Sequence, residues 1–211
     1  MKKFTILIAS TLLLACSGTY PGGALYFPGP ARAAAVLAGT ATLSDPGLAL
    51  YRDPRSRAAV ESFYSGVAGD PQVGRIILQQ ASAHDIPLPL AFAVAWGESQ
   101  FNPRAFNRNP KSVDRGLFQL NNKTFPHVRV DDFYDPQINA RLGMRHLRFC
   151  LNEGESELVA LAIYNAGTLK VRKGTPYSTL NHIARILEYR EKLEEDFLRA
   201  LLGRSSQGSA L

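Results

Sequence analysis

The sequence predicts a mostly α-helical domain that follows a secretion signal and a flexible tether. Three observations predict this arrangement. Apolar residues recur at helical spacing in about six segments between residues 55 and 203, and no run alternates cleanly as a strand would. Asp-Pro pairs at residues 70–71 and 135–136 are typical helix starts. The chain before residue 55 lacks this periodicity.

The composition is that of a globular protein and its charge favours an anionic partner. The 211 residues suffice for one domain with tails, and 45% of them are hydrophobic against 20% charged. The formal net charge of +6 suits a wall polymer or lipid head groups. Because the Lys and Arg residues are scattered and no nucleic-acid-binding motif appears, we expect no nucleic-acid partner.

Residues 1–15 have the pattern of a secretory signal peptide. Lys2 and Lys3 precede an apolar run, which is too short to span a bilayer comfortably. The run ends in Leu-Leu-Ala-Cys at residues 13–16, which resembles the lipobox of bacterial lipoproteins. The resemblance implies that Cys16 is acylated, becomes the mature N-terminus and anchors the protein to a membrane. In Gram-negative lipoproteins a following Ser, here Ser17, usually permits export to the periplasmic side of the outer membrane; an ordinary signal peptide is the alternative.

Residues 16–54 are expected to form a lipidated tether. Gly, Pro and Ala make up half of residues 17–54, and charged residues are few. Such a segment seldom forms a packed core, although Leu25, Tyr26 and Phe27 allow some packing on the domain.

The helical domain is expected over residues 55–203, with a polar, frayed tail over 204–211. Residues 100–114 have no period and are expected to be a loop, followed by one or two helical turns between Arg115 and Asn121. Cys150 falls on an apolar helix stripe and is expected to be a small buried residue, although a disulfide to Cys16 stays open. The main helices are expected at about 55–68, 70–84, 89–98, 136–151, 156–166 and from 178 or 179 to about 198.

Glu98 is the first candidate for chemistry. Ala91, Val94 and Ala95 precede it by seven, four and three residues, so they lie on the same helix face as its carboxyl group. Apolar surroundings and the nearby helix C-terminus both favour the protonated form. A carboxylic acid that stays protonated near neutral pH suits the protonation of a glycosidic oxygen.

Three short motifs follow in a fixed order. Glu98-Ser99 closes a helix, Gly-Leu-Phe-Gln follows at residues 116–119, and Tyr-Asn-Ala-Gly follows at residues 164–167. Together, over about residues 72–193, they resemble the soluble lytic transglycosylase domain, which has a lysozyme-like fold. Phe118 stands where Met is common in that family, and Asn181-His182 stands where family members often carry Asn-Tyr.

The resemblance implies a role for each motif residue. Glu98 would be the single catalytic acid/base, and Ser99 would form a hydrogen bond near it. Gln119 would contact an acetamido group of the sugar. Tyr164 would lie beside Glu98, and Asn165 would shape the turn that Gly167 ends.

The implied reaction cleaves the β-1,4 bond between N-acetylmuramic acid and N-acetylglucosamine in peptidoglycan. The substrate's own C6 hydroxyl attacks C1 and forms a 1,6-anhydro ring, so no second carboxylate is required. Trp96, Phe101 and Phe106 are candidates for packing on sugar rings, though core positions are commoner for aromatic residues. The four His residues lack ligand spacing, so no metal or other cofactor is expected.

Two other functions stay open at the level of sequence. Residues 112–121 also resemble the segment that supplies the second carboxylate of animal-type lysozymes, and Asp114 falls at its place. A muramidase would then use Glu98 and Asp114 together. The second alternative is a non-catalytic lipoprotein that binds peptidoglycan, against which the intact Glu98-Ser99 pair argues.

Overall fold

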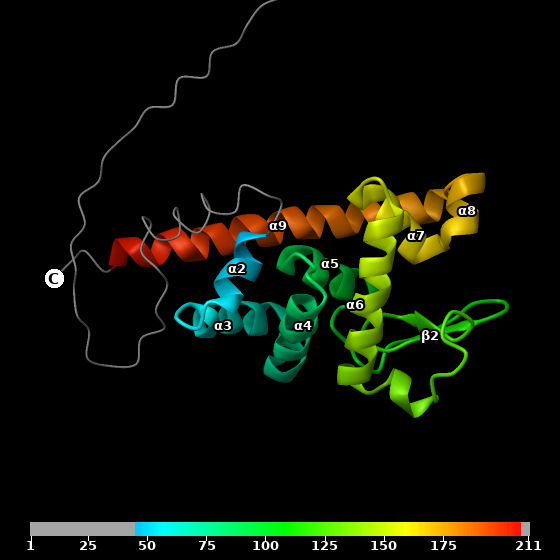
Figure 1. Ribbon diagram of the computed structural model, residues 1–211, viewed down its shortest axis with the longest axis horizontal. Coiled ribbons are helices and arrows are strands. Elements are labelled where there is room, and N and C mark those ends of the chain that lie inside the picture. Colours follow the sequence, from blue (N-terminus) through cyan, green and yellow to red (C-terminus); the bar gives the residue numbers. More distant parts are fainter. Residues whose placement is uncertain (1–44, 208–211) are drawn as a thin grey trace, which may run out of the picture.

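The computed structural model describes residues 45–207, which form a helical body with one small sheet (Figure 1). The predicted fold class is confirmed, because eight α-helices account for most of these residues. The α-helices are α2 (Pro46–Arg52), α3 (Arg57–Ala68), α4 (Pro71–Ala83), α5 (Leu88–Ser99), α6 (Pro136–Glu153), α7 (Glu157–Ala166), α8 (Thr168–Lys173) and α9 (Tyr177–Gln207). A 3-10 helix, η1 (Asp131–Phe133), precedes α6.

The helix ends follow local chemistry. Asp70 and Asp135 accept backbone hydrogen bonds from the first turns of α4 and α6, with Pro at the first helical position. Ser156 does the same for α7. Gly69 ends α3 in the left-handed conformation, with φ of 69°.

Helix α5 is the centre of the core. All residues from Leu88 to Ala95 are buried, so the helix is covered on every side and not only on the face beneath Glu98. Helix α9 packs along it and runs the length of the molecule, as the long orange-to-red helix in Figure 1 shows. The ring of Trp96 on α5 stacks on Tyr189 of α9 at 4.2 Å between centroids. Glu98, which follows this buried stretch, is therefore carried by a helix of the core.

The segment expected to be a loop and a short helix contains a sheet instead. Strands β1 (Phe106–Arg108), β2 (Val113–Arg115) and β3 (Leu120–Asn121) pair antiparallel in the order β1-β2-β3. Phe106 faces Arg115 in the first pair, and Asp114 faces Asn121 in the second. Between Arg115 and Asn121, where one or two turns were expected, residues 116–119 form a turn, but it links β2 to β3. The strands were missed because two or three residues are too few to show an alternating pattern.

Two boundaries and one additional helix also differ from the sequence prediction. Residues 46–52, expected to belong to the tether, form α2, whose Leu48 and Leu50 are buried in the core. Helix α9 continues to Gln207, past the expected start of the tail at residue 204. Helix α8 was not predicted. Residues 1–44, which include the expected signal peptide, Cys16 and most of the tether, lie outside the described residues.

No helix between residues 45 and 207 combines the length and the apolar character needed to cross a membrane.

Candidate active site

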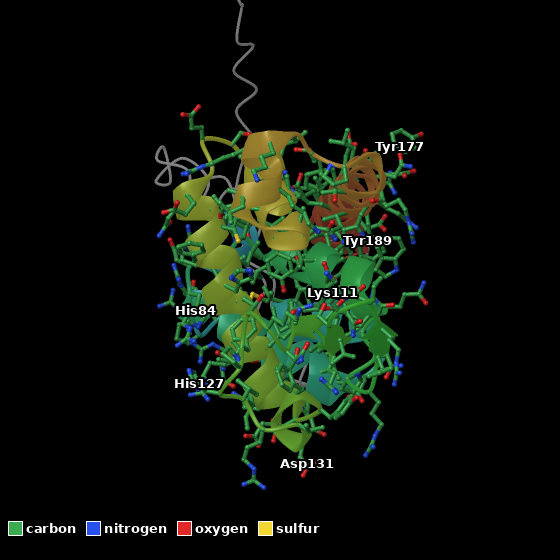
Figure 2. The ribbon with its side chains drawn as sticks, turned by 90° about the vertical axis from the view of Figure 1, so that its right-hand side faces the viewer. His84, Lys111, His127, Asp131, Tyr177 and Tyr189 are labelled. Carbon is green, nitrogen blue, oxygen red and sulfur yellow. The ribbon has the colours of Figure 1, made fainter. Side chains whose placement is uncertain are left out.

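A cleft of about 900 Å³ opens beside the end of α5. Figure 2 faces the end of the molecule where α7, α8 and the sheet lie, and it labels Lys111, one of the lining residues. The cleft brings together most residues that the motifs singled out. Among its lining residues are Glu98, Asp114, Phe118, Gln119, Tyr164, Asn165, Gly167 and His182.

Glu98 lies in the last turn of α5, and only 11% of its side chain is exposed. Burial raises the pKa of its carboxyl group above the ordinary value of 4.5, and the negative charge of Asp114 acts in the same direction. A hydrogen bond with His182 and the charge of that imidazole oppose the rise. The net effect favours the protonated acid, as the sequence predicts.

In the part of the chain that the structure describes, Ser99 forms no hydrogen bond with Glu98. Its hydroxyl group lies 2.7 Å from the carbonyl oxygen of Leu117, to which it donates, and 3.1 Å from that of Ala95. The bond to Leu117 ties the end of α5 to the turn at residues 116–119. Ser99 therefore positions the wall of the cleft.

Tyr164 supports the same turn from α7. Its hydroxyl group donates to the carbonyl oxygen of Phe118 at 3.0 Å. Burial raises its pKa well above the ordinary value of 10, and the charge of Glu98 adds to the rise. Tyr164 is thus a neutral hydrogen-bond donor near Glu98.

Gln119 lines the cleft in a left-handed backbone conformation, with φ of 44°. Its side-chain amide donates to the carbonyl oxygen of Gly116 at 3.0 Å, within its own turn. This bond leaves the amide oxygen without a hydrogen-bond partner among the described residues. A ligand in the cleft can donate to that oxygen.

Asn165 ties the end of α7 to the start of α9. Its Oδ1 accepts a hydrogen bond of 2.8 Å from the hydroxyl group of buried Thr179. Gly167 then ends α7 with φ of 81°, a conformation that favours glycine. Both residues fix the end of α7, the helix that carries Tyr164.

Asp114 lies on β2 with its carboxylate held by asparagine amides. Its Oδ1 accepts from Nδ2 of Asn121 at 2.6 Å. Its Oδ2 accepts from Nδ2 of Asn109 at 2.7 Å and of Asn107 at 3.2 Å. Asp114 therefore joins β1, β3 and the loop between β1 and β2, in addition to lining the cleft.

His182 is the residue whose role the sequence did not reveal. Its Nε2 lies 3.1 Å from Oε1 of Glu98, across 84 positions of the chain. In the sequence, only the departure from the Asn-Tyr pattern at residues 181–182 drew attention to His182, and it did not indicate that His182 contacts Glu98.

The three aromatic residues proposed for sugar packing lie elsewhere. Trp96 stacks on Tyr189, Phe101 packs on Phe92 in the core, and Phe106 lies beneath Arg115. The aromatic lining of the cleft comes from Phe118, Phe125, Phe149 and Tyr164. Residues 45–207 contain no group of three or more His, Cys, Asp or Glu side chains arranged to hold a metal ion.

A comparison with protein families gives one match. The family model described as the transglycosylase SLT domain matches residues 75–184, which is 110 of the 211 residues. The matched range lies within the stretch of about 72–193 that carries the motifs, and it includes Glu98, Asp114, Gln119, Tyr164 and His182. Comparisons with curated proteins and with solved structures gave no match.

Proposed function

The chain belongs to the transglycosylase SLT domain family, whose domain is of the peptidoglycan-cleaving lytic transglycosylase type, and from this we propose a specific reaction. The protein cleaves the β-1,4 bond between N-acetylmuramic acid and N-acetylglucosamine and forms 1,6-anhydro-N-acetylmuramic acid. Glu98 is the single acid/base. The observation that carries the proposal is one largely buried carboxyl group with a raised pKa in the lining of a large cleft.

The first half of the reaction needs an acid. Glu98 gives its proton to the glycosidic oxygen, the bond from C1 to that oxygen breaks, and N-acetylglucosamine leaves with the proton on its 4-hydroxyl. Burial supports this role, because a carboxyl group with a raised pKa still carries its proton closer to neutral pH.

The second half needs a base and a nucleophile. The C6 hydroxyl of N-acetylmuramic acid attacks C1, and its proton passes to the Glu98 carboxylate, which restores the acid. No water is consumed and Glu98 ends as it began. The surroundings of Asp114 favour this reaction over one in which Asp114 attacks the sugar, because both of its oxygens already accept hydrogen bonds from three asparagine amides.

The remaining motif residues would bind or shape the substrate site. Gln119 would hold an acetamido group through its free amide oxygen, which can accept the substrate's N–H. Ser99, Tyr164 and Asn165 would keep the cleft walls in place through their bonds to Leu117, Phe118 and Thr179.

A muramidase is the second candidate function, because Asp114 lines the same cleft as Glu98. In that enzyme the second carboxylate attacks the sugar or stabilises the cation, and water completes the reaction. The two functions give different products from the same bond. The non-catalytic alternative predicts no product at all.

The test is the identity of the released sugar. Purified protein is incubated with isolated peptidoglycan, and the soluble fragments are analysed by mass spectrometry. We expect fragments that end in 1,6-anhydro-N-acetylmuramic acid, each lighter by one water than the hydrolysed form. Fragments with reducing ends would instead identify a muramidase.

Glu98→Gln is the matched variant, since it keeps the size and hydrogen bonding of the side chain but has no proton to give. The rate of fragment release should fall by at least ~100-fold, the usual scale for one acid/base group. Near-wild-type turnover in a folded variant would reject Glu98 as the acid.

We also propose that Cys16 carries a lipid anchor and that the protein acts from the periplasmic side of the outer membrane. The observation behind this proposal is the Leu-Leu-Ala-Cys sequence at residues 13–16, which follows two lysines and an apolar run. Cells are labelled with radioactive palmitate and the wild type is compared with Cys16→Ala. Label should enter the wild type alone; equal labelling of both proteins refutes the anchor, and fractionation of the membranes tests the location.

A further inference from the structure

The pairing of His182 with Glu98 is built into the packing of α9 on α5. The two side chains are only 21% and 11% exposed, and the imidazole Nε2 lies 3.1 Å from one carboxyl oxygen, Oε1. A pair this sheltered is screened little by solvent. The interaction therefore affects how readily the carboxyl group of Glu98 gives up its proton.

Gly97 lets the two helices approach closely enough for the pairing. A Cβ atom at this position would lie 2.6 Å from Cγ1 of Ile186 and 3.7 Å from Cε1 of His182. Ile186 lies one helical turn after His182 and is itself buried. Thr179, bonded to Asn165, fixes the first turn of α9. The imidazole is thus held in place from its own helix and from α5 and α7.

The other polar groups around the pair differ in kind from His182. Asp114 on β2 is acidic, Tyr164 on α7 is held neutral, and Lys170 on α8 lines the cleft without a described bond to Glu98. On α9 itself, Arg185 lies over the ring of Trp96. Among the described residues, His182 alone forms a hydrogen bond or ion pair with the Glu98 carboxyl group.

We propose that His182 is a positioning residue that selects which oxygen of Glu98 delivers the proton and sets how tightly Glu98 holds it. This inference rests on the proposed function, in which Glu98 is the acid/base. We assign a hydrogen to Nε2, which donates to Oε1, so the acid proton resides on the other oxygen, Oε2. The imidazole also favours the carboxylate, against the desolvation that favours the acid.

The contact then contributes to both halves of the reaction. As Oε2 gives its proton to the glycosidic oxygen, negative charge develops on Glu98 and the bond from Nε2–H to Oε1 becomes charge-assisted and stronger. When the C6 hydroxyl closes the anhydro ring, its proton returns to Oε2, and the bond to His182 weakens again.

Two substitutions separate the effects of the N–H donor, the charge and the ring of His182. His182→Gln keeps an N–H donor but has no titratable group, and His182→Phe keeps a ring but has neither donor nor charge. His182→Gln removes the imidazole charge, and His182→Phe removes both the charge and the N–H donor. Each of these features lowers the pKa of Glu98 in the wild type. The pKa of Glu98 should therefore rise from wild type to His182→Gln, and rise further in His182→Phe.

The first measurement does not depend on activity. The full chain, carrying Cys16→Ala to prevent acylation, is labelled with ¹³C at the glutamate carboxyl carbons and titrated by NMR. The midpoint of the Glu98 signal should move to higher pH in the stated order. The signal of Glu157, which is bonded to Arg190 at 2.6 Å, is the internal control and should titrate alike in all three proteins. An unchanged Glu98 midpoint in His182→Phe overturns the proposal.

The second measurement is the dependence of the initial cleavage rate on pH. The alkaline limb should move to higher pH in the same order, because the acid keeps its proton longer. The maximal rate should fall by at least ~10-fold in His182→Phe, the scale of one hydrogen bond to a charged group, and less in His182→Gln. Glu188→Gln, an exposed position on α9, is the matched control and should leave both features unchanged.

The outcomes separate this inference from the proposed function. A lower rate without any shift of the limb or of the Glu98 signal would mean that His182 only fills space. A shifted Glu98 signal together with hydrolytic products, or with no product, would retain the pairing and reject the transglycosylase reaction.

Discussion

At the scale of single residues, the site depends on two carboxyl groups in contrasting surroundings. Glu98 is sheltered at the end of the core helix and has one histidine partner. Asp114 lies in the sheet, with three amide donors on its two oxygens. Burial favours a protonated carboxyl group at Glu98, whereas the three amide donors let Asp114 link β1, β3 and the loop after β1. The two groups therefore suit different tasks although they line one cleft.

The raised pKa of Glu98 makes a prediction about stability and pH. The folded protein holds this proton more tightly than the unfolded chain does, so the wild type loses stability as pH rises from the ordinary value of 4.5 through the raised value. Glu98→Gln has no such loss. The variant should match the wild type in unfolding free energy below about pH 4 and exceed it near pH 7, as urea denaturation at the two pH values measures. A difference that is independent of pH would contradict the raised pKa.

Asp114 offers a second prediction at this scale. Asp114→Asn keeps one acceptor oxygen for the asparagine amides, whereas Asp114→Ala keeps none. If Asp114 only organises the sheet, Asp114→Asn should retain a substantial part of the cleavage rate, well short of the ~100-fold loss expected of a group in the chemistry. Asp114→Ala should lose more activity and melt at a lower temperature. Loss of all activity in a folded Asp114→Asn variant would favour the muramidase.

At the scale of elements, the turn between β2 and β3 contributes Phe118 and Gln119 to the lining of the cleft and is bonded to the end of α5. The side chain of buried Asn139 on α6 forms three hydrogen bonds, one with this turn, one with the end of β2 and one with η1. Its Oδ1 accepts from the backbone N–H of Phe118 at 2.7 Å, and its Nδ2 donates to the carbonyl oxygens of Phe133 and Arg115. Gly116, with φ of 78°, leaves the space that the Asn139 amide occupies. One asparagine thus joins α6, η1 and the sheet.

Asn139→Ala should therefore destabilise the protein markedly. It leaves one backbone N–H and two carbonyl oxygens without their partners in a buried region, at about 1–3 kcal/mol for each group that stays unsatisfied. We expect a loss of at least about 2 kcal/mol in unfolding free energy and a lower cleavage rate. Asn122→Ala, which removes one partly buried bond to the N–H of Val113, is the control and should cost less. Equal losses in the two variants would reject the special role of Asn139.

At the scale of the whole molecule, the core extends from α2 to α9. Leu48 and Leu50 of α2 lie in the core cluster that also contains Phe92 and Leu193. The carboxyl group of Asp45 accepts from the backbone N–H of Leu88, at the start of α5, at 2.8 Å. The first helix therefore supports the helix that carries Glu98, across 43 positions of the chain.

Deletion of α2 tests this support. A chain that starts at residue 55 loses the burial of Leu48 and Leu50, which is worth about 3–6 kcal/mol for two leucine side chains. It should be much less stable than a chain that starts at residue 45, as thermal denaturation of the two proteins measures. If the two shortened chains melt at the same temperature, α2 contributes nothing to the core.

Much of the helical framework follows from the sequence alone. The capping groups at Asp70, Asp135 and Ser156 act on backbone groups two or three residues away, so the chain encodes these helix starts locally. The positive-φ glycines at residues 69 and 167 encode helix ends in the same way. The apolar run before Glu98 predicted its burial, and three motifs predicted the family that the comparison then found.

The tertiary structure decided the features that depend on partners distant in the chain. The strands of the sheet are two or three residues long and exist because their neighbours pair with them, not because of any propensity. Helix α2 is short and forms against a core that the rest of the chain supplies. The contact between His182 and Glu98 joins positions 84 residues apart, and only the packing of α9 on α5 at Gly97 brings them together. Local chemistry thus determined the helix ends and the apolar run before Glu98, whereas long-range packing determined which side chain contacts the Glu98 carboxyl group.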